Sequence, residues 1–74
     1  MRITIMSQVR FLIATDVGTF PPGKRHLIPR RAVGTIVGRC GELLLATFYY
    51  TSITGKEVWV KNCIVDAAEL EVLT

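Results

Sequence analysis

The sequence predicts an all-β domain. Short apolar runs rich in β-branched and aromatic residues recur along the chain, and clusters of glycine, proline and serine that favour turns separate them. Half of the 74 residues are hydrophobic and the mean hydropathy is +0.41, so the chain has enough apolar surface for a core. A chain of this length forms a single domain, residues 1–74, and no apolar run reaches the roughly 18 residues that a membrane span needs.

The first strand is expected over residues 8–14, QVRFLIA. Val9, Phe11 and Ile13 alternate on one face and Arg10 lies on the other, which is the period of two that a strand requires. Residues 1–7 contain RITI, which either extends this strand or forms a separate one.

Residues 15–31 are expected to form a long loop. All three prolines and four of the nine Lys and Arg residues lie between positions 18 and 31. Proline fixes φ and lacks a backbone donor, and glycine tolerates positive φ, so DVG, PPG and IPRR have the chemistry of turns.

The next two strands form a predicted hairpin. Residues 32–40 are rich in β-branched residues and are interrupted by Gly34 and Gly38, which indicates bulges, tight bends or a close backbone approach. CGE at 40–42 predicts the hairpin turn. Residues 43–50, LLLATFYY, are expected to form a buried strand rather than a helix, because a glycine precedes them and aromatic residues end them.

The last third of the chain is expected to form one long strand and one short one. After the turn SITGKE, residues 56–62 place Val58 and Val60 on one face and Trp59 on the other. Asp66 precedes Glu69 by three positions, which is the spacing of a capping box, so DAAEL predicts a single helical turn. LEVL then forms the final strand.

This order of elements resembles the SH3-like small β-barrel. The matching pieces are VRFLIA, AVGTIVGR, LLLATFYY, EVWVKN and DAAELEVL. The pattern is similar to KOW and Tudor-type modules and to photosynthetic accessory barrels such as the small accessory barrel of photosystem I and the variable chain of ferredoxin–thioredoxin reductase. The resemblance implies a barrel of about five strands, a long first loop, one helical turn before the last strand, and a partner-binding groove beside the loop.

The sequence contains no catalytic or metal motif. His26 is the only histidine, and nothing places Ser7 or Ser52 beside it together with an acid. Cys40, Cys63 and one distant histidine do not supply the ligands of a zinc site. We therefore expect a protein without enzymatic activity, cofactor or metal. The two cysteines are expected to be reduced thiols, with a disulfide as the alternative.

Charge is distributed unevenly along the chain. Residues 1–39 carry seven Lys and Arg against one acidic residue, whereas residues 40–74 carry two basic and five acidic residues, for a net charge of +3. Such asymmetry indicates a basic face that attracts an acidic protein surface or nucleic acid. The candidate partner-binding residues combine the loop cations with aromatic and basic residues of the loop and strands: Phe20, Lys24, Arg25, His26, Arg30, Arg31, Tyr49, Trp59 and Lys61.

The expected function is non-enzymatic binding. We expect an accessory or inhibitory subunit that docks on an acidic protein surface through the basic, proline-rich loop, as the photosynthetic accessory barrels dock on their enzyme complexes. Small inhibitors encoded by phages or plasmids share these features. The alternative is a nucleic-acid-binding barrel that places the same loop on phosphates and stacks Tyr or Trp side chains on bases.

Two further expectations concern location and assembly. The N-terminal stretch lacks a continuous hydrophobic region and a cleavage site, so we expect a cytoplasmic protein without a membrane partner. Exposed strand edges at RITIM or LEVL predict homo-oligomerisation by strand pairing. Replacing Arg25, Arg30 and Arg31 with alanine is expected to leave the fold intact and to weaken partner binding.

Overall fold

The structure is a computed structural model, and it describes residues 3–73. Over this range the chain forms seven strands and one 3₁₀ turn, and no helix in it is long and apolar enough to cross a membrane. In chain order the elements are β1 (Gln8–Phe11), β2 (Thr15–Val17), β3 (His26–Ile28), β4 (Val33–Cys40), β5 (Leu43–Thr51), β6 (Glu57–Val65), η1 (Ala67–Glu69) and β7 (Leu70–Val72).

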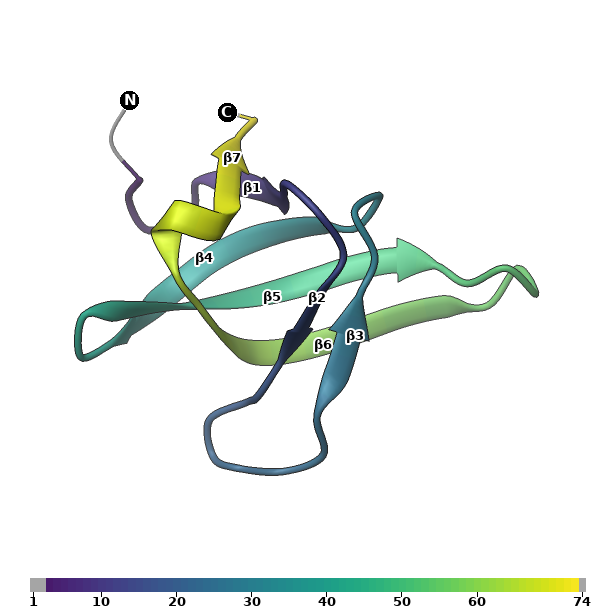
Figure 1. Ribbon diagram of the computed structural model, residues 1–74, viewed down its shortest axis with the longest axis horizontal. Helices are drawn as coiled ribbons and strands as arrows, with labels where there is room; N and C mark the ends of the chain where they lie inside the picture. Colours follow the sequence, from purple (N-terminus) through teal and green to yellow (C-terminus); the bar gives the residue numbers. More distant parts are fainter. Residues whose placement is uncertain (1–2, 74) are drawn as a thin grey trace.

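The predicted all-β class is confirmed. Five strands form an antiparallel sheet in the order β6-β5-β4-β1-β7, and β2 and β3 form a second, two-stranded sheet. The large sheet is strongly curved but open, with β6 and β7 at its edges, and the β2–β3 hairpin lies across it (Figure 1). Both strands of the hairpin turn one side chain inward, because Val17 and Ile28 are buried in the core.

The meander β4-β5-β6 follows the predicted strands closely. Its two turns each contain a glycine with positive φ, Gly41 at 62° and Gly55 at 85°, where a residue with a side chain is disfavoured. β6 extends to Val65, beyond the predicted end at residue 62. Asn62 adopts φ 55° where the β5–β6 register shifts, and after this bulge Cys63 and Val65 return to the core side.

Close packing around Gly34 explains why a glycine interrupts β4. A Cβ atom at this position would lie 2.6 Å from the Phe48 ring. Phe48 is fully buried and meets Phe11 edge-on, with ring centroids 4.9 Å apart. The second glycine, Gly38, lies beside a bulge in β4, since the β4–β5 register shifts between Ile36 and Gly38. Both expectations for these glycines, close approach and bulge, are met.

The segment 15–31 differs from the expected loop. It contains the hairpin β2–β3, in which three residues of each strand pair and the intervening residues 18–25 form the connection. The strand before it is also shorter than residues 8–14. β1 ends at Phe11 and the chain bends, so Ile13 is 73% exposed instead of facing the core.

The two ends of the described chain are built differently. Residues 3–7 form no strand, although the backbone N–H of Met6 donates to the carbonyl of Ile36 in β4. At the other end the predicted helical turn and final strand are present. The carboxylate of Asp66 accepts a hydrogen bond from the N–H of Ala68, which caps η1, and β7 then pairs with β1.

Candidate docking surfaces

Two aromatic side chains stand on the outer face of the β4-β5-β6 sheet. Because side chains alternate along a strand, burial of Phe48 and Val60 turns Tyr49 and Trp59 to the opposite side. Tyr49 and Trp59 are cross-strand partners. Their ring centroids lie 4.4 Å apart, and the ring planes are inclined at 42°. The Trp59 side chain is nevertheless 63% exposed, which confirms its predicted outward orientation.

A polar contact holds this aromatic pair in place. The hydroxyl of Tyr49 donates to Oε1 of Glu57 at 2.6 Å. This hydrogen bond is the largest cause of a raised pKa at Tyr49, with partial desolvation and the charge of Glu57 acting in the same direction. The same hydrogen bond orients the Tyr49 ring, which packs against the indole beside it.

Apolar side chains are exposed on the same sheet, one of them next to the aromatic pair. Val33 is the cross-strand partner of Tyr49 on β4, and Val37 and Leu43 are exposed further along the sheet. Lys61 follows Trp59 at the next outward position of β6 and is exposed. We call this set the outer sheet face: Val33, Val37, Leu43, Tyr49, Trp59 and Lys61. The aliphatic members of this face were not predicted from the sequence. The position of Val33 next to Gly34 in the strand could have indicated that the Val33 side chain faces outward.

The loop cations are largely engaged within the molecule. Arg25 Nε lies 3.0 Å from Asp16 Oδ2 in an exposed ion pair. Arg30 donates to the carbonyl of Leu12 and lies 3.6 Å from Glu71. Arg31 is the most fully engaged of the three.

Arg31 joins the end of the first connection to β5. Its guanidinium donates to the carbonyl of Thr51 from Nε at 3.0 Å and from Nη2 at 2.8 Å. It also lies over the Tyr50 ring, 5.5 Å from the centroid. These contacts fasten strand β4 at its start, so Arg31 has a structural role.

The remaining predicted loop residues lie at the far end of the hairpin. Phe20 is 53% exposed and its N–H donates to Asn62, while Lys24 is exposed and His26 is half-buried in β3. The hairpin packs on the core side of the sheet, because its inward residues Val17 and Ile28 belong to the core. The predicted set is therefore spread over three places: Tyr49, Trp59 and Lys61 on the outer sheet face, Phe20, Lys24, Arg25 and His26 on the hairpin, and Arg30 and Arg31 between β3 and β4. Among the hairpin residues, Phe20 lies against the edge of β6 at Asn62.

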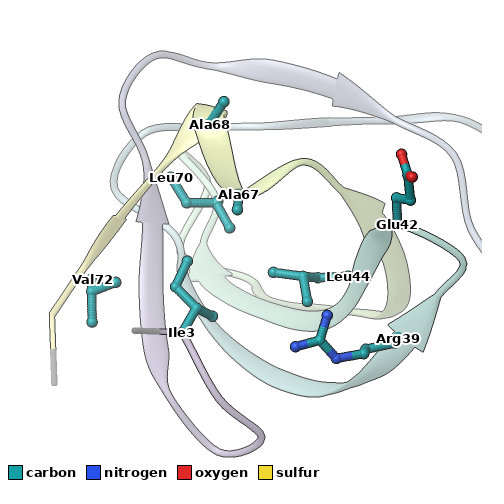
Figure 2. A pocket seen from close by; sticks show the side chains of 8 residues that line it. All are labelled: Ile3, Arg39, Glu42, Leu44, Ala67, Ala68, Leu70 and Val72. Carbon is teal, nitrogen blue, oxygen red and sulfur yellow. The ribbon is translucent and has the colours of Figure 1, made fainter. Parts of the chain in front are cut away.

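A pocket of about 530 Å³ opens at another end of the molecule (Figure 2). Its lining combines apolar side chains with two charged ones, Arg39 from the end of β4 and Glu42 from the β4–β5 turn. The described lining offers no hydroxyl, thiol or imidazole. The lining residues are Ile3, Arg39, Glu42, Leu44, Ala67, Ala68, Leu70 and Val72.

The cysteines do not pair, and the described residues form no metal cluster. Cys40 is half-buried and Cys63 is fully buried, and both are free thiols. Burial raises the pKa of Cys63 to about 11, which keeps this thiol protonated and unreactive. Across residues 3–73, no group of three or more His, Cys, Asp and Glu side chains is placed to hold a metal ion.

The sequence matches no protein-family model, and no curated protein or solved structure is significantly similar to the chain. The interpretation of the two surfaces therefore rests on their chemistry.

Proposed function

We propose that this protein is a non-enzymatic binding module with an SH3-like small barrel fold. The sheet order β6-β5-β4-β1-β7, the long first connection and the 3₁₀ turn before the last strand support this fold. The β2–β3 hairpin occupies the first connection, which is the variable part of such barrels.

The observation that carries the binding role is the exposed Trp59 stacked on Tyr49. A large aromatic side chain that is 63% exposed contributes little to the stability of the monomer, whereas Trp and Tyr are typical centres of protein interfaces. Tyr49 is already held by Glu57, so a partner would meet a preformed surface and lose little side-chain entropy there.

The partner we propose is a protein with an acidic rim around an apolar centre. Lys61 borders the aromatic pair, and the chain carries a net charge of +3. Such charges increase the rate of association more than they increase affinity. The accessory or inhibitory role predicted from the sequence is kept, with the outer sheet face rather than the loop as the principal contact.

The test is capture of partners from extract of the source cells with matched baits. Wild-type protein is compared with Trp59→Ala and, as the control, Lys24→Ala, which removes an exposed cation from the hairpin end. We expect Trp59→Ala to lose captured protein by about tenfold or more, in line with an aromatic hot spot, and Lys24→Ala to retain it. Equal capture by Trp59→Ala, or loss only with Lys24→Ala, would contradict the assignment.

A second candidate is single-stranded nucleic acid, favoured by the position of Lys61 beside the Tyr49–Trp59 pair. Exposed aromatic rings next to a cation can stack bases and contact the backbone. Titration of oligonucleotides at two salt concentrations, followed by Trp59 emission, separates the two candidates. Micromolar binding that weakens steeply with salt supports nucleic acid, and absence of binding at low salt leaves the protein partner.

A further inference from the structure

The edge strand β6 has one covered half and one free half. In the second half, the carbonyl of Asn62 accepts from the N–H of Phe20 at 3.0 Å, and the N–H of Ile64 donates to Gly18 at 2.9 Å. Over the described residues, no backbone hydrogen bond covers the side of residues 57–61 that faces away from β5. In Figure 1 this part of β6 lies along the lower edge of the sheet, toward the β5–β6 turn.

In the β5–β6 hairpin, the alternation of backbone hydrogen bonds leaves the N–H and C=O groups of two residues in this free half directed away from β5. The N–H of Ser52 donates to Lys56 at 2.7 Å, and hydrogen-bonded pairs alternate along an antiparallel ladder. Val58 and Val60 therefore bond to β5. Glu57 and Trp59 direct their N–H and C=O groups away from the sheet, where another strand can meet them.

The free half of β6 lacks most of the usual protections of a sheet edge. Edge strands are commonly short, bulged, interrupted by proline, covered by another segment or lined with charged residues; here the charges, Glu57 and Lys61, stand only at the two ends of the segment. The opposite edge, β7, is only three residues long. Residues 57–61 contain no proline, and the bulge lies at their far end, where Lys61 and Asn62 both stand opposite Thr47.

The residues of this segment are complementary to themselves. EVWVK has an acid at one end, a base at the other and an exposed tryptophan at the centre. When a second copy of the segment runs antiparallel to the first with the two Trp59 residues opposite each other, Glu57 lies opposite Lys61 and Val58 lies opposite Val60. A twofold axis at Val58 would also satisfy the backbone groups, but it would leave both charges without partners.

We propose that two copies of this chain pair antiparallel through residues 57–61, about a twofold axis at Trp59. Glu57 of each copy then faces Lys61 of the other, and the outward backbone groups of Trp59 bond across the axis. The free segment begins after the β5–β6 turn and stops where residues 18–20 cover the edge, so Trp59 is its midpoint. Pairing at this register fills the free edge completely.

Two exposed apolar side chains at the ends of the segment agree with this arrangement. Ile53 in the β5–β6 turn is 96% exposed, and Phe20 beside Asn62 is 53% exposed. The twofold axis brings the turn of one copy toward the end of the free edge in the other, where Phe20 lies. The pairing also makes the two outer sheet faces continuous, and it does not depend on the proposed function.

Sedimentation equilibrium on the full chain tests the pairing. Wild-type protein is compared with Lys61→Glu, Glu57→Lys, and an equimolar mixture of these two variants. Lys56→Glu is the control, because it makes the same charge change in the turn, outside the paired segment. Lys61→Glu is the cleaner of the two variants, since Glu57→Lys also removes the acceptor of the Tyr49 hydroxyl.

We expect wild-type protein and the control to dimerise with the same dissociation constant. Each single variant replaces two opposite-charge pairs with two like-charge pairs, which raises that constant on the order of tenfold. In the mixture, a heterodimer restores opposite charges at both positions and dimerisation returns. The proposal is overturned by a wild-type monomer at concentrations up to about 1 mM, by single variants that dimerise like wild type, or by a mixture no heavier than its components.

Discussion

At the scale of single residues, steric contact and burial decide what each position tolerates. Gly34 and Gly38 look alike in the sequence, because each interrupts the same β-branched strand. Their surroundings differ. A Cβ at Gly34 would overlap the buried ring of Phe48, whereas a Cβ at Gly38 would be 3.7 Å from Leu45, an ordinary contact.

Gly34→Ala is therefore expected to destabilise the protein by about 2 kcal/mol, because the overlap with Phe48 forces packing around Phe11 to shift. Gly38→Ala is the matched control and is expected to change the free energy of unfolding by less than about 0.5 kcal/mol. Urea denaturation of both variants measures the difference. Equal stability of the two would show that Phe48 moves aside without cost.

Cys63 predicts a loss of stability at high pH. Burial raises the pKa of its thiol from 9.0 to about 11 in the folded chain, so the unfolded chain ionises first as the pH rises. The contribution of this group to stability is complete well below pH 9.0 and is lost as the pH rises to about 11, by roughly 3 kcal/mol at most. Urea denaturation across this range should show a smaller loss in Cys63→Ala than in the wild type.

Thiol labelling provides an independent check on the same residue. Half-buried Cys40 is expected to react with a disulfide reagent in the native protein, and buried Cys63 only after unfolding. Rapid labelling of both cysteines without denaturant would contradict the burial of Cys63.

At the scale of elements, alternation and turn chemistry predicted most of the fold. The strands of the β4-β5-β6 meander, their glycine turns, η1 and β7 follow local signals that extend over several residues or fix a cap. β2 and β3 have only three residues each, too few for a period to be visible, and they are stabilised by burial of Val17 and Ile28. Burial of these two side chains therefore stabilises a hairpin within residues 15–31, where the turn-forming residues predicted a loop.

The internal contacts of Arg31 change the expectation that arginines of the first connection can be replaced without an effect on the fold. Arg31→Ala removes two hydrogen bonds to the Thr51 carbonyl and the contact with Tyr50, so it is expected to destabilise the fold by about 1 kcal/mol. Lys24→Ala, the control in the same connection, is expected to have no measurable effect. Thermal unfolding compares the two, and equal melting temperatures would show that Arg31 is dispensable for the fold.

At the scale of the whole molecule, the sequence could not predict which candidate residues share a surface. Tyr49, Trp59 and Lys61 were expected on adjacent strands, and the structure places them on one face. The loop cations lie elsewhere, on the hairpin and between β3 and β4. The hairpin folds over the core side, and no local pattern between residues 15 and 31 encodes the side on which it packs.

The same topology positions the two surfaces that we propose for interaction. The outer sheet face presents a preformed aromatic pair, and the free edge of β6 borders it at Trp59. A second copy at the edge leaves the Trp59 side chain on the outer face, so self-association and partner docking are compatible. Arg25 and Arg30 have carboxylates beside them, which lowers the effective charge of the hairpin as a competing surface.

The most direct measurement of the central claim is quenching of Trp59 fluorescence by acrylamide, free and with the purified captured partner. Trp59 is the only tryptophan, so the signal from this chain has one source, and a partner's own tryptophans can be replaced by a non-fluorescent analogue. We predict efficient quenching in the free protein and strong protection in the complex. Equal quenching in both states, with binding verified separately, would show that the partner docks elsewhere and would contradict the assignment of the outer sheet face.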